Sequence, residues 1–193
     1  MDRGRKFNGN EVMRFTHTPL KGAYLIDLEK KEDERGFFSR LYCHQEFLKN
    51  ELENNFVQAN NSYSVSKGTL RGLHYQLGAS AETKLVRCIK GSFYDVILDL
   101  RPSSPTFGHS FGAELSADNR TMMYVPKGFA HGFLTLEDHS EVLYFVSQYY
   151  SKELERGIRW NDPVFSIPWP SSPVVISERD QGHPDFDSGY HLI

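Results

Sequence analysis

Apolar and polar residues alternate in short stretches along most of the chain, and turn residues separate these stretches. A period of two is typical of β-strands, whose successive side chains point to opposite faces. Only residues 44–52 carry apolar side chains at roughly helical spacing, and from Tyr150 onward prolines interrupt any regular pattern. Strands are predicted over residues 23–28, 36–41, 56–64, 70–76, 84–89, 92–100, 108–115, 121–125, 132–136 and 141–147.

Many short strands with almost no helix predict an all-β protein, either an antiparallel sandwich or a small barrel. One face of the strand over 92–100 mixes Phe93 and Ile97 with Asp95 and Asp99. Because a buried carboxylate is costly, we expect this face to line a polar region. The 193 residues suffice for one domain with a sizeable core. We expect a flexible N-terminal extension over residues 1–13 and a single domain over residues 14–193.

The composition narrows the classes of function. With 39% hydrophobic and 24% charged residues, global disorder is excluded. A net charge of −3 argues against a nucleic-acid partner and against an anionic membrane surface. No apolar run of about 18 residues could span a membrane, and residues 1–13 lack the apolar core of a secretory signal. Cys43 and Cys88 form neither a CxxC pair nor a zinc pattern, which favours a reduced, cytoplasmic setting.

Candidate chemistry is concentrated in the stretch Arg71-Gly72-Leu73-His74-Tyr75-Gln76 and in Lys84-Leu85-Val86-Arg87. On a strand, His74 would point to the face opposite Leu73 and Tyr75. An imidazole near cations, with an ordinary pKa of about 6.5, can act as a base at neutral pH. The alternative is a histidine hydrogen-bonded inside a barrel.

Ten segments, in order and at compatible spacing, resemble the dTDP-4-dehydrorhamnose 3,5-epimerase family over about residues 14–183. The resemblance implies a cupin-type jelly roll (double-stranded β-helix) with minor helices. It implies inversion of C3 and/or C5 in a nucleotide-linked 4-keto-6-deoxyhexose, in a homodimer that exchanges N-terminal strands, without metal or other cofactor. The expected product is an activated deoxysugar for surface polysaccharide. The segments lie within residues 33–38, 58–62, 68–76, 84–88, 95–101, 104–108, 126–133, 160–163, 169–170 and 177–180.

Four catalytic roles follow from the resemblance. His74 matches the base, Asp180 its orienting partner, Lys84 the cation at the enolate oxygen, and Tyr144 the acid on the opposite face of the sugar. Epimerisation beside a ketone requires a base, a cation and an acid, since the C–H proton is removable only if the enolate is stabilised. Without the resemblance, Tyr144 would be assigned to the core, Lys84 to solvent and Asp180 to a surface turn.

The resemblance also implies substrate-binding residues. Arg35 and Phe38 match residues that reach the nucleotide in the neighbouring subunit's site, and Tyr149 matches an aromatic residue that stacks on the base. The remaining residues match contacts to the sugar or diphosphate: Gln58, Asn60, Arg71 and His131.

Arg40 departs from the family's pattern, in which a glutamate at this position accepts a hydrogen bond from thymine. Arginine only donates, and cytosine N3 only accepts. An alternative substrate is therefore a CDP-linked 4-keto-6-deoxyhexose; equally, Arg40 could point to solvent or meet the phosphates. Two further alternatives are a non-catalytic sugar-nucleotide-binding cupin and a metal-dependent cupin, the latter disfavoured because Gln76, not a second histidine, follows His74.

Overall fold

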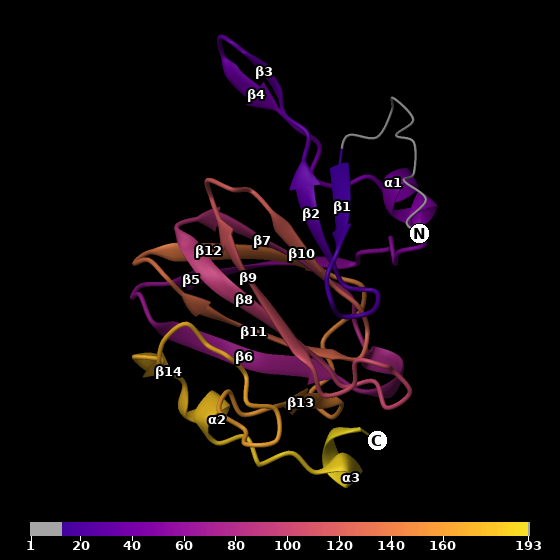
Figure 1. The fold of residues 1–193 in the computed structure, drawn as a ribbon, viewed down its shortest axis with the longest axis vertical. Helices are drawn as coiled ribbons and strands as arrows, with labels where there is room; N and C mark the ends of the chain where they lie inside the picture. The colour runs from indigo at the N-terminus through magenta and orange to yellow at the C-terminus, as the bar shows by residue number, and fades with distance from the viewer. Residues whose placement is uncertain (1–12, 193) are drawn as a thin grey trace.

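The computed structural model describes residues 13–192 and consists of two facing sheets with short helices at their periphery (Figure 1). The first sheet has the strand order β1-β2-β10-β7-β12-β5; the second has the order β13-β6-β11-β8-β9, with β14 beside β6. The strands are β1 Met13–His17, β2 Tyr24–Leu28, β3 Lys31–Asp33, β4 Gly36–Phe38, β5 Gln58–Ser64, β6 Thr69–Gln76, β7 Lys84–Lys90, β8 Ser92–Asp99, β9 Ser110–Ser116, β10 Met122–Val125, β11 Phe129–Thr135, β12 Ser140–Val146, β13 Glu155–Gly157 and β14 Val175–Ile176. The helices are α1 His44–Lys49, α2 Glu178–Gln181, α3 Ser188–His191 and the 3-10 turn η1 Gly78–Ser80.

The predicted all-β class is confirmed, and each predicted strand overlaps an observed one. Strand β3, which was not predicted, pairs with β4 as a hairpin, and β4 covers only the first three residues of the strand predicted over 36–41. Strands β1, β13 and β14 escaped prediction; the last two contain only three and two residues, too few to show a period. The expected flexible extension falls outside the described residues except for Met13, which begins β1 and is buried.

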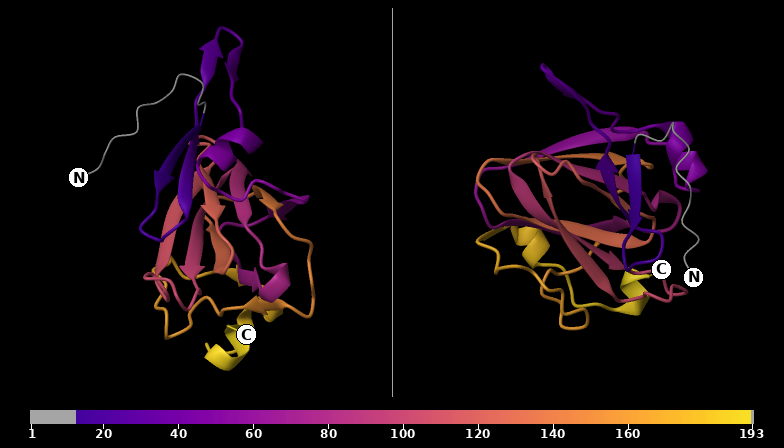
Figure 2. Two further views of the ribbon diagram at one scale, coloured as in Figure 1. Left: turned by 90° about the vertical axis from the view of Figure 1, so that its right-hand side faces the viewer. Right: turned by 45° about the horizontal axis from the view of Figure 1, so that its top comes forward.

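The alternation along the strands builds three apolar layers. Phe93 and Ile97 point between the sheets and join Val86 and Phe133 in the central core. The opposite face of β8 packs beneath the C-terminal segment, which runs along the outside of the second sheet (Figure 2). The outer face of the first sheet is covered in part by α1, through Phe47. The mixed face of β8 is therefore largely core, which corrects our expectation of a polar lining.

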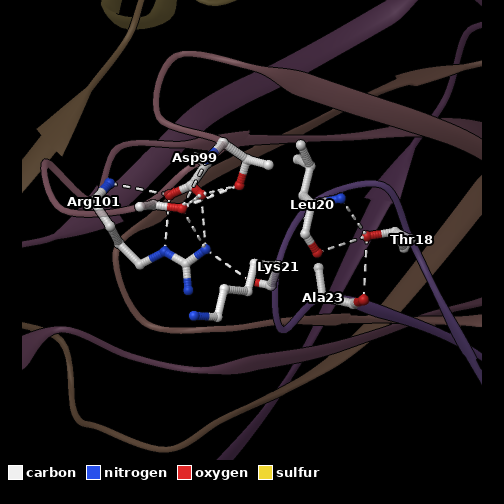
Figure 3. Close-up of polar contacts among 8 residues, drawn as sticks. Thr18, Leu20, Lys21, Ala23, Asp99 and Arg101 are labelled. Atoms are coloured by element: carbon white, nitrogen blue, oxygen red, sulfur yellow. Dashed lines mark hydrogen bonds and ion pairs between the residues drawn. The ribbon is translucent and has the colours of Figure 1, made fainter.

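Each carboxylate on that mixed face has a partner. Asp99 accepts hydrogen bonds from the Arg101 guanidinium at 2.7–2.8 Å and from Ser104 and Thr106, while Arg101 also donates to the carbonyl of Lys21 in the β1–β2 turn (Figure 3). Burial raises the pKa of Asp99, but the donors outweigh it and lower the pKa to about 2. Asp99 thus anchors the β1–β2 turn at one end of the sandwich.

The β3–β4 hairpin projects away from both sheets (Figures 1 and 2). All six residues of its two strands are exposed, and the Phe38 side chain is 71% exposed. An apolar side chain at such a position has no packing role within its own chain. Among residues 13–192, no helix has the length and apolarity needed to cross a bilayer.

Candidate active site

A cavity of about 700 Å³ lies between the two sheets. Strands β5, β7 and β12 of the first sheet form one wall, strands β6 and β11 of the second form the other, and α2 contributes at the edge. The structure brings together here eight of the twelve residues predicted for the site: Gln58, Asn60, Arg71, His74, Lys84, His131, Tyr144 and Asp180.

The His74–Asp180 pair links β6 to α2 across 106 residues of sequence. His74 Nε2 lies 2.8 Å from Asp180 Oδ1, and the backbone N–H of Gly72 donates to the other carboxylate oxygen at 3.0 Å. Ser177 caps α2 by accepting from the Asp180 backbone N–H, which places the carboxylate toward β6. Burial raises the pKa of Asp180, but nearby His183 and the bonds from His74 and Gly72 hold that pKa well below its usual range. The carboxylate is ionised and can stabilise an imidazolium.

A second histidine–aspartate pair lies beside the first. His131 on β11 is the register partner of His74 on β6, and its Nε2 lies 2.7 Å from Asp95 Oδ1. Asp95 is fully buried, and its other carboxylate oxygen has no hydrogen-bond partner among the described residues. Burial raises the pKa of Asp95, an effect that His131 only partly opposes.

The opposite wall presents Tyr144 and Lys84 in neighbouring rows of the first sheet. Tyr144 is paired with Val86 on β7 and Asn60 on β5, and Val146, two residues on, is paired with Lys84. Burial and the nearby Glu82 carboxylate raise the pKa of Tyr144, with Arg71 acting in the opposite direction. Tyr144 therefore keeps its phenolic proton at neutral pH and can donate it.

Gln58 and Arg71, two of the predicted substrate-binding residues, are held in place by hydrogen bonds to residues of β5. Gln58 Nε2 donates to Asn60 Oδ1 at 2.8 Å. The Arg71 guanidinium donates to Ser64 Oγ at 3.1 Å and to the Tyr63 carbonyl at 2.9 Å. Arg71 is thereby anchored at the rim, where its charge can meet an anionic ligand.

Four predicted site residues do not line the cavity of the single chain. Arg35 forms an exposed ion pair with Asp33 on the β3–β4 hairpin, and Phe38 lies at the end of the same hairpin. Tyr149 is 66% exposed. Arg40 Nη1 donates to Glu46 Oε1 of α1 at 2.7 Å, so this guanidinium has a partner within its own chain.

Sequence reasoning missed several residues that line the cavity. Arg179 adds a cation from α2 and pairs with Glu155, which also accepts from Tyr150 at 2.7 Å. Glu82 contacts Lys84 and Gln76. Arg179 could have been found from its place next to Asp180, and Glu82 from its place two residues before Lys84. Further lining residues with polar side chains that were missed include Ser62, Thr69, Gln148 and Ser177.

One group of side chains could hold a metal ion. Ligand atoms of His74, Asp180 and His183 lie within 4.8 Å of one another. The Nε2 atom of His183 is buried without a hydrogen-bond partner among the described residues, 3.7 Å from Asp180 Oδ1. Two imidazoles and a carboxylate suit zinc. The same Asp180 oxygen, however, is already bonded to His74, so a metal would compete with that hydrogen bond.

Comparisons with known proteins point to one family. The family profile described as dTDP-4-dehydrorhamnose 3,5-epimerase matches residues 17–188. The chain is 45% identical to the dTDP-4-dehydrorhamnose 3,5-epimerase of Shigella flexneri over 184 residues, covering 93% of this chain and 100% of that protein.

Two solved structures extend these similarities to the fold. The crystal structure of dTDP-4-dehydrorhamnose 3,5-epimerase from Elizabethkingia anophelis has a TM-score of 0.88 at 44% identity, covering 91% of this chain and 97% of that chain. The Legionella pneumophila dTDP-6-deoxy-D-glucose-3,5-epimerase, solved in complex with dTDP-4-keto-L-rhamnose, has a TM-score of 0.83 at 37% identity, covering 89% and 91%. These similarities confirm the predicted cupin-type jelly roll.

Proposed function

This chain belongs to the dTDP-4-dehydrorhamnose 3,5-epimerase family, and from that membership we propose how its cavity performs the reaction. The protein is an isomerase, an epimerase of a dTDP-linked 4-keto-6-deoxyhexose. The observation that carries the mechanism is the arrangement of one cavity: a histidine on the second sheet paired with a carboxylate from α2, facing a tyrosine and a lysine on the first sheet.

His74 is the base. Since its Nε2–H donates to the ionised Asp180, Nδ1 is the ring nitrogen left to accept a proton. It removes the hydrogen from the carbon beside the ketone, and the electron pair of the C–H bond moves into the enolate. Asp180 holds the ring orientation and stabilises the imidazolium that forms.

Lys84 and Tyr144 complete the reaction from the facing wall. The Lys84 ammonium stabilises the negative charge that develops on the ketone oxygen. Tyr144 then delivers its phenolic proton to the enolate carbon from the face opposite His74, which inverts the stereocentre. Arg71 and Arg179, at the same cavity, supply positive charge for the diphosphate. The nucleotide assigned is dTDP; the Arg40–Glu46 ion pair leaves the CDP alternative without a supporting observation.

The active assembly is proposed to be a homodimer with exchanged N-terminal strands, located in the cytoplasm and supplying an activated deoxysugar such as dTDP-L-rhamnose for polysaccharide. The projecting β3–β4 hairpin, with exposed Arg35 and Phe38, supports the exchange, because these side chains could complete the nucleotide site of a partner. Sedimentation of the purified protein should give twice the chain mass, and Phe38→Ala should weaken dTDP binding. A monomer with full activity would refute the exchange.

NMR in deuterated water tests the function directly. We expect deuterium at C3 and C5 of dTDP-4-keto-6-deoxyglucose; the CDP sugar, assayed in parallel, should not exchange. Tyr144→Phe separates the two proton transfers: His74 still exchanges the proton, but the product retains its configuration. Absence of exchange with either nucleotide sugar would refute the epimerase, and inversion by Tyr144→Phe would remove Tyr144 as the acid.

A further inference from the structure

Glu82, which precedes β7, is a carboxylate inside the cavity to which the mechanism above gives no role. Its side chain is only 9% exposed and lines the cavity. Its two oxygens face different partners: Oε1 accepts from Lys84 Nζ, and Oε2 accepts from Gln76 Nε2. Removing a carboxylate from water costs several kcal/mol unless it is paired. Both oxygens of Glu82 are paired, and each partner belongs to the cavity wall.

Gln76 fixes Glu82 to the backbone of the site. Its Oε1 accepts from the Ser151 N–H at 2.6 Å. Its Nε2 has two N–H donors, which three acceptors share: Glu82 Oε2, the Ser80 carbonyl at 3.1 Å and the Tyr149 carbonyl at 3.2 Å. A side chain held at three backbone points is rigid. The chain of contacts therefore runs from the backbone through Gln76 and Glu82 to the ammonium group of Lys84.

Lys84 needs such an anchor because its stem is long and flexible, and because the substrate carries a diphosphate. An untethered ammonium would move toward the phosphate charge rather than remain at the sugar ketone. An ammonium has three N–H donors, so the bond to Glu82 leaves two for the substrate.

We propose that Glu82 is a positioning residue that holds Lys84 at the place of the ketone oxygen, and that its carboxylate also places a negative charge in the cavity that Tyr144 lines. This inference rests on the proposed function and deepens it. The rise in the Tyr144 pKa from burial and Glu82 agrees with the second role. The other titratable or charged groups lining the cavity around Tyr144 are Lys84 on β7, Arg71, His74 and Tyr75 on β6, His131 on β11, Tyr150 before β13, Glu155 on β13, and Arg179 and Asp180 on α2.

Glu82→Gln tests the proposal, because it removes the charge at nearly constant size. We expect kcat to fall by about tenfold or more while KM changes less than about threefold, since the loss is confined to the transition state. Without the negative charge, Tyr144 ionises more easily, so the alkaline limb of the kcat profile should move to lower pH. Glu82→Asp keeps the charge and should restore the position of that limb. Glu114→Gln on β9, outside the cavity, is the matched control and should behave as the parent.

The outcomes separate this proposal from the function beneath it. A parent protein that does not exchange deuterium refutes the epimerase mechanism and the proposal with it. An active parent with an unchanged Glu82→Gln profile overturns the proposal alone. A third outcome is a fall in the kcat of Glu82→Gln that Glu82→Asp does not restore, while the alkaline limb stays in place. This result reveals a merely structural role for Glu82 and also overturns the proposal. If Glu82→Gln does not fold, Glu82→Asp tests the proposal instead, because its shorter side chain displaces Lys84 but keeps the charge. We then expect a lowered kcat with the alkaline limb unmoved, and a kcat equal to that of the parent would overturn the proposal.

Discussion

The two histidine–aspartate pairs of the cavity have the same composition, and their histidines are register partners on adjacent strands, yet their surroundings differ. His74 is 35% exposed and its partner Asp180 has a lowered pKa; His131 is 9% exposed and its partner Asp95 has a raised pKa. Asp180 receives a second donor, the Gly72 N–H, whereas one oxygen of Asp95 has none among the described residues. A histidine–aspartate pair therefore becomes a base only where the imidazole is accessible and the carboxylate is fully hydrogen-bonded.

The difference assigns different roles to the two pairs. An ionised carboxylate beside an accessible imidazole favours proton uptake by that imidazole, which suits the His74–Asp180 pair to catalysis. Asp95 is fully buried, and its carboxylate lies 2.7 Å from His131 Nε2, which holds the ring in place. We therefore expect His131 to serve as a fixed hydrogen-bonding group rather than as a base.

The largest expected effect separates the two histidines. His74→Ala should abolish deuterium incorporation into the keto-sugar, a loss of about 10³-fold or more, because no group replaces the base. Binding of dTDP, measured by calorimetry, should stay near that of the parent. His131→Ala should reduce the rate yet leave measurable exchange. Equal loss in both variants would break the distinction between the pairs.

Substitution by asparagine should affect the free energy of unfolding differently at the two aspartates. Asp180→Asn should lower kcat by roughly 10²–10⁴-fold and lower the free energy of unfolding at pH 7 by about 2 kcal/mol. Because the pKa of Asp180 is lowered by folding, its contribution is present above the unfolded pKa of about 3.9 and is lost as pH falls further.

The pKa shift of Asp95 on folding has the opposite sign to that of Asp180. Its pKa is raised by folding, so its ionisation opposes folding above pH of about 3.9, and Asp95→Asn should leave the free energy of unfolding at pH 7 unchanged or raise it. The Asn oxygen can still accept from His131. Urea unfolding of both variants at pH 4 and pH 7 measures the contrast. Equal destabilisation by the two substitutions at pH 7 would contradict it.

Metal ions give a third way to distinguish the pairs, since only His74–Asp180 has a further imidazole, His183, within ligand distance among the described residues. Prolonged chelation should leave the epimerase rate unchanged within about twofold, because proton transfer needs no metal. Added Zn²⁺ should inhibit by occupying His74, and His183→Gln should weaken that inhibition relative to its own zinc-free rate. A rate that chelation abolishes would require a metal in the mechanism.

The smallest effect is expected far from the cavity. Asp99 resembles Asp180 in its lowered pKa, about 2, but it serves the β1–β2 turn. Asp99→Asn should cost about 2 kcal/mol of the free energy of unfolding at neutral pH, a contribution that disappears in the parent as pH falls from about 4 to 2. The kcat of the folded variant should match that of the parent. A fall in kcat without a fall in stability would show that Asp99 acts on the cavity.

Local patterns were sufficient for the strands and for part of the site. The period of two located the strand that carries His74 and the strand that carries Tyr144, and it placed Leu73 and Tyr75 together in the apolar layer beneath the C-terminal segment. Family resemblance added Asp180, which carries no local signal of its own, and gave Lys84 its specific role at the enolate oxygen. The roles of all the predicted site residues stay predictions, and a single chain leaves four of them outside the cavity: Arg35, Phe38, Arg40 and Tyr149.

The order of residues along the chain was thus enough for the all-β class, for most strand positions and for the identity of the candidate base. It did not reveal that Asp95 is fully buried, that Glu82 joins Lys84 to Gln76, or that Arg40 meets Glu46. The physical reason is range. Alternation is a property of neighbouring residues, whereas desolvation and charge pairing depend on atoms that the fold brings together from distant strands, 106 residues apart in the case of His74 and Asp180.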